Sequence, residues 1–107
     1  MPPVSRIEQL TEILSDNPTD AFARYSLALE YANSGETETA LSEFRKLLSR
    51  NPDYVPGYQM LAQTMMRAGM KAEAGEMLRK GIETATRVGN THAKSEMEGM
   101  LQELVIE

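Results

Sequence analysis

The chain has 107 residues, of which 41% are hydrophobic and 25% charged, and its formal net charge is −5. This size and polarity suit one globular domain and exclude intrinsic disorder. The lack of cysteine excludes disulfides and thiolate metal sites, and an acidic chain without a basic stripe is a poor partner for nucleic acid or an anionic membrane.

Apolar residues recur with helical spacing along the whole chain, which predicts six helices. Their expected ranges, in chain order, are 4–16, 20–34, 37–50, 54–68, 71–86 and 90–105. In the first helix we expect Ile7, Leu10, Ile13 and Leu14 to share the buried face. In the sixth helix the corresponding apolar line is Ala93, Met97, Met100, Leu101 and Leu104.

Residues with special backbone preferences agree with these limits. Pro56 falls in the first turn of the fourth helix, where its missing N–H leaves no bond unmade. The N-caps are expected to be Thr19, Asp53 and Asn90, because short polar side chains accept bonds from free helix amides. Three glycines stand where helices end and a positive φ is needed, namely Gly35, Gly69 and Gly89.

The chain also matches itself at an offset of 34 residues, without a gap across three segments. The identical pairs are Leu14/Leu48, Ser15/Ser49, Asn17/Asn51, Pro18/Pro52, Leu27/Leu61, Ala28/Ala62, Gly35/Gly69, Ala40/Ala74, Arg45/Arg79 and Lys46/Lys80. Such a period indicates stacked hairpins of two helices, in which each unit contacts only its neighbours. The paired alanines allow the two helices of one hairpin to approach closely.

These residues resemble the tetratricopeptide repeat family, whose helix–turn–helix unit has 34 residues. In the first unit the resemblance is carried by Leu27, Ala28, Tyr31, Gly35, Ala40, Phe44 and Pro52, and in the second by Tyr58, Leu61, Ala62, Met65, Gly69, Ala74 and Leu78. It implies an all-α fold, a right-handed α-solenoid of about six helices in antiparallel hairpins. The expected division of the single domain 1–107 is a half-repeat helix (4–17), repeat 1 (18–52), repeat 2 (53–86) and a C-terminal capping helix (90–105).

The sequence departs from the family pattern at two places. Arg24 stands where the family often has Trp, and we expect its head to meet a carboxylate while its stem covers apolar surface. Thr86 stands where a second closing Pro would be, which suggests that the array ends there.

An apolar stripe on the second helix is left over after its hairpin face is formed. In the family, the first helix of each unit lines a concave groove that binds a peptide or helix of a partner protein. The resemblance places in that groove Phe22, Tyr25, Leu29, Ala32, Asn33, Gln59, Gln63, Met66 and Arg67. The alternative is that the first or the sixth helix covers this stripe and consumes the groove.

Some members of the family bind chaperone C-termini with a clamp of Lys, Asn and Arg. In this sequence Tyr25 and Leu29 occupy the Lys and Asn places of that clamp. We therefore expect the chain not to act as a chaperone co-factor of that kind.

Catalytic chemistry is not expected. His92 is the only histidine, so an ordinary metal site cannot form, and no glycine-rich loop is present to hold a phosphate. The expected function is therefore a non-catalytic protein–protein interaction scaffold without cofactor or metal. Because the start shows no signal-peptide pattern and no run approaches about 18 apolar residues, the expected location is the cytoplasm.

A second function stays open from the sequence alone. The chain is then a structural, self-associating homodimer, with the stripe on the second helix or the terminal segment Leu104, Val105 and Ile106 as its contact.

Overall fold

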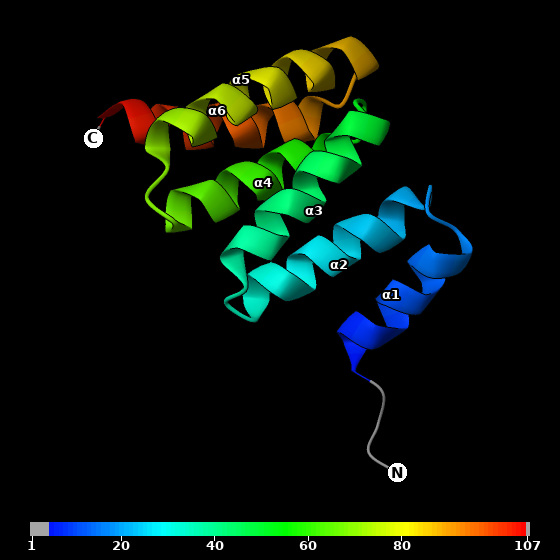
Figure 1. The fold of residues 1–107 in the computed structure, drawn as a ribbon. Coiled ribbons are helices and arrows are strands. Elements are labelled where there is room, and N and C mark those ends of the chain that lie inside the picture. The colour runs from blue at the N-terminus through cyan, green and yellow to red at the C-terminus, as the bar shows by residue number, and fades with distance from the viewer. Residues whose placement is uncertain (1–4, 107) are drawn as a thin grey trace.

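The structure is a computed structural model that describes residues 5–106, with side chains described up to residue 104. It contains six helices in the order α1 (Arg6–Asp16), α2 (Ala21–Asn33), α3 (Thr37–Arg50), α4 (Val55–Arg67), α5 (Lys71–Val88) and α6 (Thr91–Ile106) (Figure 1). No strand occurs in this part of the chain. The expected all-α helical repeat fold is confirmed, and the helix limits agree with the sequence to within two residues.

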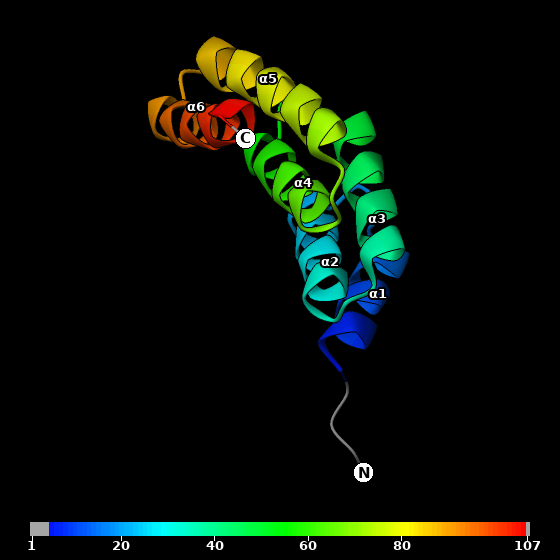
Figure 2. The same cartoon turned by 90° about the vertical axis from the view of Figure 1, so that its left-hand side faces the viewer.

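The helices form two layers in an elongated stack of 50 × 29 × 20 Å. Figure 2 shows α2, α4 and α6 in one layer, here called the inner layer, and α1, α3 and α5 in the other, the outer layer. Each helix packs on its neighbours in the chain, and the inner helices also contact one another, α2 with α4 and α4 with α6. The two helices of each hairpin therefore lie in different layers.

Small residues lie where the helices of a hairpin come closest. Ala28 and Ala40 are completely buried between α2 and α3, and their equivalents Ala62 and Ala74 are completely buried between α4 and α5. The equal burial of residues 34 positions apart shows that the two hairpins pack in the same way. A larger side chain at these sites would overpack the hairpin by about 1–3 kcal/mol.

Arg24 fills the place of the missing tryptophan as expected. Its Nη1 donates to Oε2 of Glu43 on α3 at 2.7 Å, and its Nη2 donates to the carbonyl oxygen of Pro18 at 3.2 Å. The same carbonyl accepts a bond from Arg50 Nη1 at 2.8 Å. Two arginines thus fasten the turn before α2 to α3.

The expected glycine conformations are confirmed. Gly35, Gly69 and Gly89 have φ values of +80°, +78° and +80°, which residues with a Cβ rarely adopt. α5 nevertheless continues to Val88, two residues beyond the expected end, because Gly89 is the first residue at which the helix can stop in this way.

Two of the three expected N-caps are wrong. Asp20 caps α2 by accepting from the Ala23 amide at 2.9 Å, while the Thr19 hydroxyl donates to the Asn17 side chain. Asp53 caps nothing, because its carboxylate is bound to Arg87 at 2.7 Å. Only Asn90 caps as expected, accepting from the Ala93 amide at 3.1 Å.

The expected buried face of α1 also needs a correction. Leu10 and Leu14 are buried against Ala23 and Leu27 of α2, but Ile13 is 45% exposed. The reason is that α1 has only one neighbouring helix among the described residues, α2, so a single stripe is covered.

No helix in the described residues has the length and apolarity needed to cross a membrane. The assignment of the helices to a half-repeat, two repeats and a cap stays a prediction from the sequence.

Candidate partner-binding surface

The nine predicted groove residues lie on two neighbouring helices of the inner layer. Five are on α2 and four on α4, and these two helices are in contact. The structure therefore places the two halves of the predicted groove next to each other on one layer of the stack (Figure 2).

Phe22 is the most exposed large hydrophobic residue on this surface, with 66% of its area accessible. It lies in the first turn of α2, one helical turn before Tyr25, so both side chains point to the same side of the helix. Most of a phenylalanine in water is an unfavourable arrangement, and covering it would contribute on the order of 1.5–2 kcal/mol to binding.

Tyr25 is half-buried and is held by two other rings. Its centroid lies 5.4 Å from that of Tyr54, and its edge meets Phe44 with a centroid distance of 6.4 Å. Partial burial, with a smaller effect from Tyr54, raises the pKa of the Tyr25 phenol above its ordinary value. The pKa of Tyr54 is likewise raised, mainly by burial. At neutral pH both hydroxyls are therefore uncharged hydrogen-bonding groups on an aromatic surface.

The remaining apolar members of the set lie lower in the surface. Leu29, Ala32 and Met66 are half-buried and pack against the main hydrophobic core. They form a floor rather than projecting side chains. Asn33 and Arg67 are exposed and are the last residues of α2 and α4, so they lie together at one end of the layer.

Polar contacts extend this surface from α4 onto α6. Gln59 Nε2 donates to Glu96 Oε2 at 3.1 Å, and the other carboxylate oxygen of Glu96 contacts His92 Nε2. Gln63 is half-buried one turn further along α4. His92 is exposed, which agrees with the expected solvated role of this residue.

The flanking helices leave the exposed end of the stripe open. α1 packs on the side of α2 that carries Ala23 and Leu27, and α6 contacts α4 and α5 within the described part of the chain. Of the stripe, Leu29 and Ala32 are partly covered by the core, whereas Phe22 is not covered.

Two residues of this surface were missed by sequence reasoning. Tyr54 lies just before α4, outside any helical pattern, and Glu96 was assigned to the polar face of a capping helix. The offset of 34 residues pairs Tyr54 with Asp20 and Glu96 with Ala62, so the repeat carried no signal for either one.

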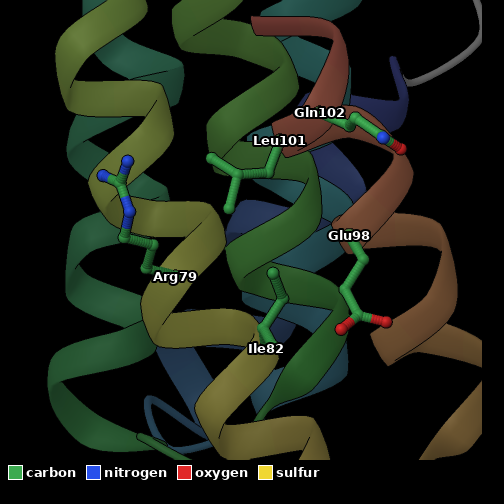
Figure 3. A pocket seen from close by; sticks show the side chains of 5 residues that line it. All are labelled: Arg79, Ile82, Glu98, Leu101 and Gln102. Atoms are coloured by element: carbon green, nitrogen blue, oxygen red, sulfur yellow. The ribbon is translucent and has the colours of Figure 1, made fainter. Parts of the chain in front are cut away.

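A second feature lies at the other end of the molecule, away from the predicted groove. A hollow of about 460 Å³ opens between α5 and α6, lined by Arg79, Ile82, Glu98, Leu101 and Gln102 (Figure 3). In Figure 3 the ribbons of α3 and α4 lie behind it, so it faces away from the rest of the stack. We call it the end hollow. None of the nine predicted groove residues lines it.

Among the described residues, no group of three or more His, Asp or Glu side chains gathers in a way that could hold a metal ion. The arrangement on α2 and α4 is an apolar and aromatic surface with polar ends, which is suited to binding rather than to bond-breaking chemistry.

Comparison with known proteins is consistent across sequence and structure. Two tetratricopeptide repeat family models match residues 3–58 and 31–94. A TPR repeat-containing protein of Pseudomonas aeruginosa is 29% identical over 98 residues, covering 92% of this chain and 93% of that protein.

Solved structures show the same similarity. A tetratricopeptide repeat domain protein from Salinibacter ruber has a TM-score of 0.78 at 31% identity, over 82% of this chain and 89% of the other. The TPR2B domain of yeast Sti1, determined in a complex with pHsp70, has a TM-score of 0.86 at 20% identity, over 92% of this chain and 79% of the other. The second similarity concerns the fold alone.

Proposed function

Since the chain belongs to the tetratricopeptide repeat family, we propose that it is a non-catalytic protein–protein interaction scaffold that binds a peptide or helix of a partner along α2 and α4. The observation that carries this proposal is the exposure of Phe22 beside the half-buried Tyr25 and Tyr54. An apolar anchor of the partner would cover Phe22, and the two phenols would supply hydrogen bonds at its edge.

The polar residues supply the other half of the binding surface. Gln63 and Arg67 of α4 offer side-chain donors to backbone carbonyls of an extended or helical segment. The binding of pHsp70 by the TPR2B domain of Sti1 is a related use of the same fold. In this chain Tyr25 and Leu29 occupy the Lys and Asn places of a carboxylate clamp, so the ligand we propose is an internal apolar segment rather than a free C-terminus.

A selection from a peptide library with the full chain as bait tests the proposal. Peptides that bind the wild type should lose about 5- to 30-fold in affinity for Phe22→Ser, because the apolar contact is removed. Val88→Ser is the matched control, since Val88 is also largely exposed but lies at the end of α5. NMR shift changes on peptide addition should concentrate on amides of α2 and α4.

The opposite result is equally clear. If the selected peptides bind Phe22→Ser and Val88→Ser equally well and shift amides elsewhere, the α2–α4 surface is not the binding site. The cytoplasmic location and the exclusion of nucleic acid as a partner stay predictions from the sequence.

A further inference from the structure

The two ends of the stack are complementary halves of one hairpin. Each complete hairpin has an inner helix followed by an outer helix, as in α2 with α3 and α4 with α5. α6 is an inner helix with no outer helix after it among the described residues, and α1 is an outer helix with no inner helix before it. We propose that the α1 helix of a second copy docks on the end hollow between α5 and α6, so that copies associate head to tail.

The exposure of Ile13 supports this arrangement. The residue 34 positions later is Leu47 of α3, which is completely buried. α3 has an inner helix on both sides, α2 and α4, whereas α1 contacts only α2. Ile13 is thus a core residue of the repeat whose second covering helix is absent, and α6 of another copy would supply that helix.

Arg79 supports the same arrangement from the other end. It occupies the place on α5 that Arg45 occupies on α3. Arg45 reaches along the outer layer to Glu73 of the next outer helix, with a distance of 4.0 Å between Nη2 and the carboxylate. Arg79 lines the end hollow and makes no ion pair within the described residues, because no outer helix follows α5 there (Figure 3).

The chemistry of the two surfaces fits as well. Ile13 is bordered on α1 by the exposed carboxylates of Glu12 and Asp16. The end hollow offers the apolar side chains of Ile82 and Leu101 with the guanidinium of Arg79, and it also contains one carboxylate, Glu98. A docked α1 would bring Ile13 to the apolar floor and its carboxylates toward Arg79.

This occupant explains the features better than the terminal patch expected from the sequence. The side chains of Val105 and Ile106 lie outside the described residues, and Leu104 is half-buried beside the hollow. A contact between two different surfaces is heterologous, so it leaves one free α1 and one free end hollow on every dimer. Association would therefore continue beyond two copies.

Sedimentation of the wild-type chain over a range of concentrations up to about 1 mM, which also registers weak contacts, is the first measurement. The average mass should rise steadily with concentration. Ile13→Lys and Arg79→Glu should each remain monomeric, since each destroys one of the two surfaces. The matched controls Val88→Lys and Lys80→Glu make the same kinds of change outside the proposed interface and should associate like the wild type. Circular dichroism of all four variants checks that the helices are retained.

Mixing the two monomeric variants provides the decisive test. Ile13→Lys keeps its end hollow and Arg79→Glu keeps its α1, so an equal mixture should form a dimer of twice the monomer mass that does not grow. A wild type that stays monomeric throughout the range overturns the proposal. So does a mixture that stays monomeric, because that outcome indicates a symmetric contact instead. Association unaffected by Ile13→Lys or by Arg79→Glu overturns it equally.

Discussion

The guanidinium of Arg24 lies 2.7 Å from the carboxylate of Glu43, and the two side chains are only 11% and 12% exposed. This pair connects α2 to α3 inside the first hairpin, at the position where the family often has an apolar tryptophan. A nearly buried charge is stable only while its partner is present, because neither charge can regain its hydration. The pair is therefore a structural element of the repeat and not part of a binding site.

Replacement of Arg24 by Met should lower the free energy of unfolding by about 1–3 kcal/mol, because Glu43 then keeps its charge with less compensation. Urea unfolding followed by circular dichroism measures the change. Arg45→Met is the matched control. Its pair with Glu73 is more than half exposed and 4.0 Å long, so its loss should change stability by less than about 0.5 kcal/mol. Equal effects of the two substitutions would contradict this account.

Gly81→Ala should also destabilise the chain, although alanine is the better helix former. A Cβ on Gly81 would lie 2.8 Å from the Cβ of Tyr58 and 2.5 Å from the sulfur of Met97. Met97 can move, but the Tyr58 Cβ cannot move without its backbone. The net loss should be about 1–2 kcal/mol, after a gain of up to about 1 kcal/mol in helix propensity.

Gly99→Ala is the control for this prediction. Gly99 is also inside a helix, but a Cβ there would meet no atom within 4 Å. The substitution should raise the free energy of unfolding by up to about 1 kcal/mol. The two changes should thus have opposite signs in the same thermal or urea unfolding assay, and equal signs would disprove the close packing of α5 on α4 and α6.

Gly35→Ala tests the turn between α2 and α3. The φ of Gly35 is +80° and nothing lies within 4 Å of a Cβ, so any cost comes from the backbone alone. We expect a loss of about 1 kcal/mol in the free energy of unfolding. Gly35→Asn should lose less, because Asn adopts positive φ more readily. An Asn variant less stable than the Ala variant would point to side-chain crowding instead.

The pair of Asp53 with Arg87 predicts a response to pH. The hydrogen bond from Arg87, opposed by a smaller desolvation effect, lowers the pKa of Asp53 below its ordinary value of 3.8. A lowered folded-state pKa means that the pair stabilises the fold above the ordinary carboxyl pKa and loses this effect as pH falls through the folded value.

Arg87→Met should therefore raise the pKa of Asp53 toward 3.8, as measured by NMR titration of its side-chain carboxyl. Because both side chains are largely exposed, added salt should weaken the effect in the wild type. Lys80→Met removes a charge from the same helix without touching Asp53, and it should leave this titration unchanged. A shift of similar size in both variants would assign the effect to net charge rather than to the hydrogen bond.

Local chemistry was sufficient for much of the fold. The helical spacing of apolar residues, Gly35 and Gly69 at equivalent turns, and the buried pairs Ala28/Ala62 and Ala40/Ala74 are properties of neighbouring residues and of one repeat length. Arg24 was also assigned its carboxylate partner in advance, because a charged residue on a buried face needs a counter-charge. The nine predicted groove residues could be assigned to one surface for the same reason, since α2 and α4 are equivalent helices.

The N-caps show where local reasoning is weakest. Thr19 and Asp20 are both suitable caps, and the choice between them depends on the angle at which the turn enters α2. Asp53 was assigned a cap, but Arg87 from a distant helix competes for its carboxylate.

The sequence by itself determined the six helices, their pairing into stacked hairpins, and the family, because these depend on interactions within and between adjacent segments. Only the tertiary structure decided that Ile13 is exposed, that Tyr54 stands against Tyr25, and that an apolar hollow with Arg79 opens between α5 and α6. The physical reason is that exposure at the ends of a stack is set by which neighbouring helix is missing. A periodic pattern of residues looks the same whether or not that neighbour is present.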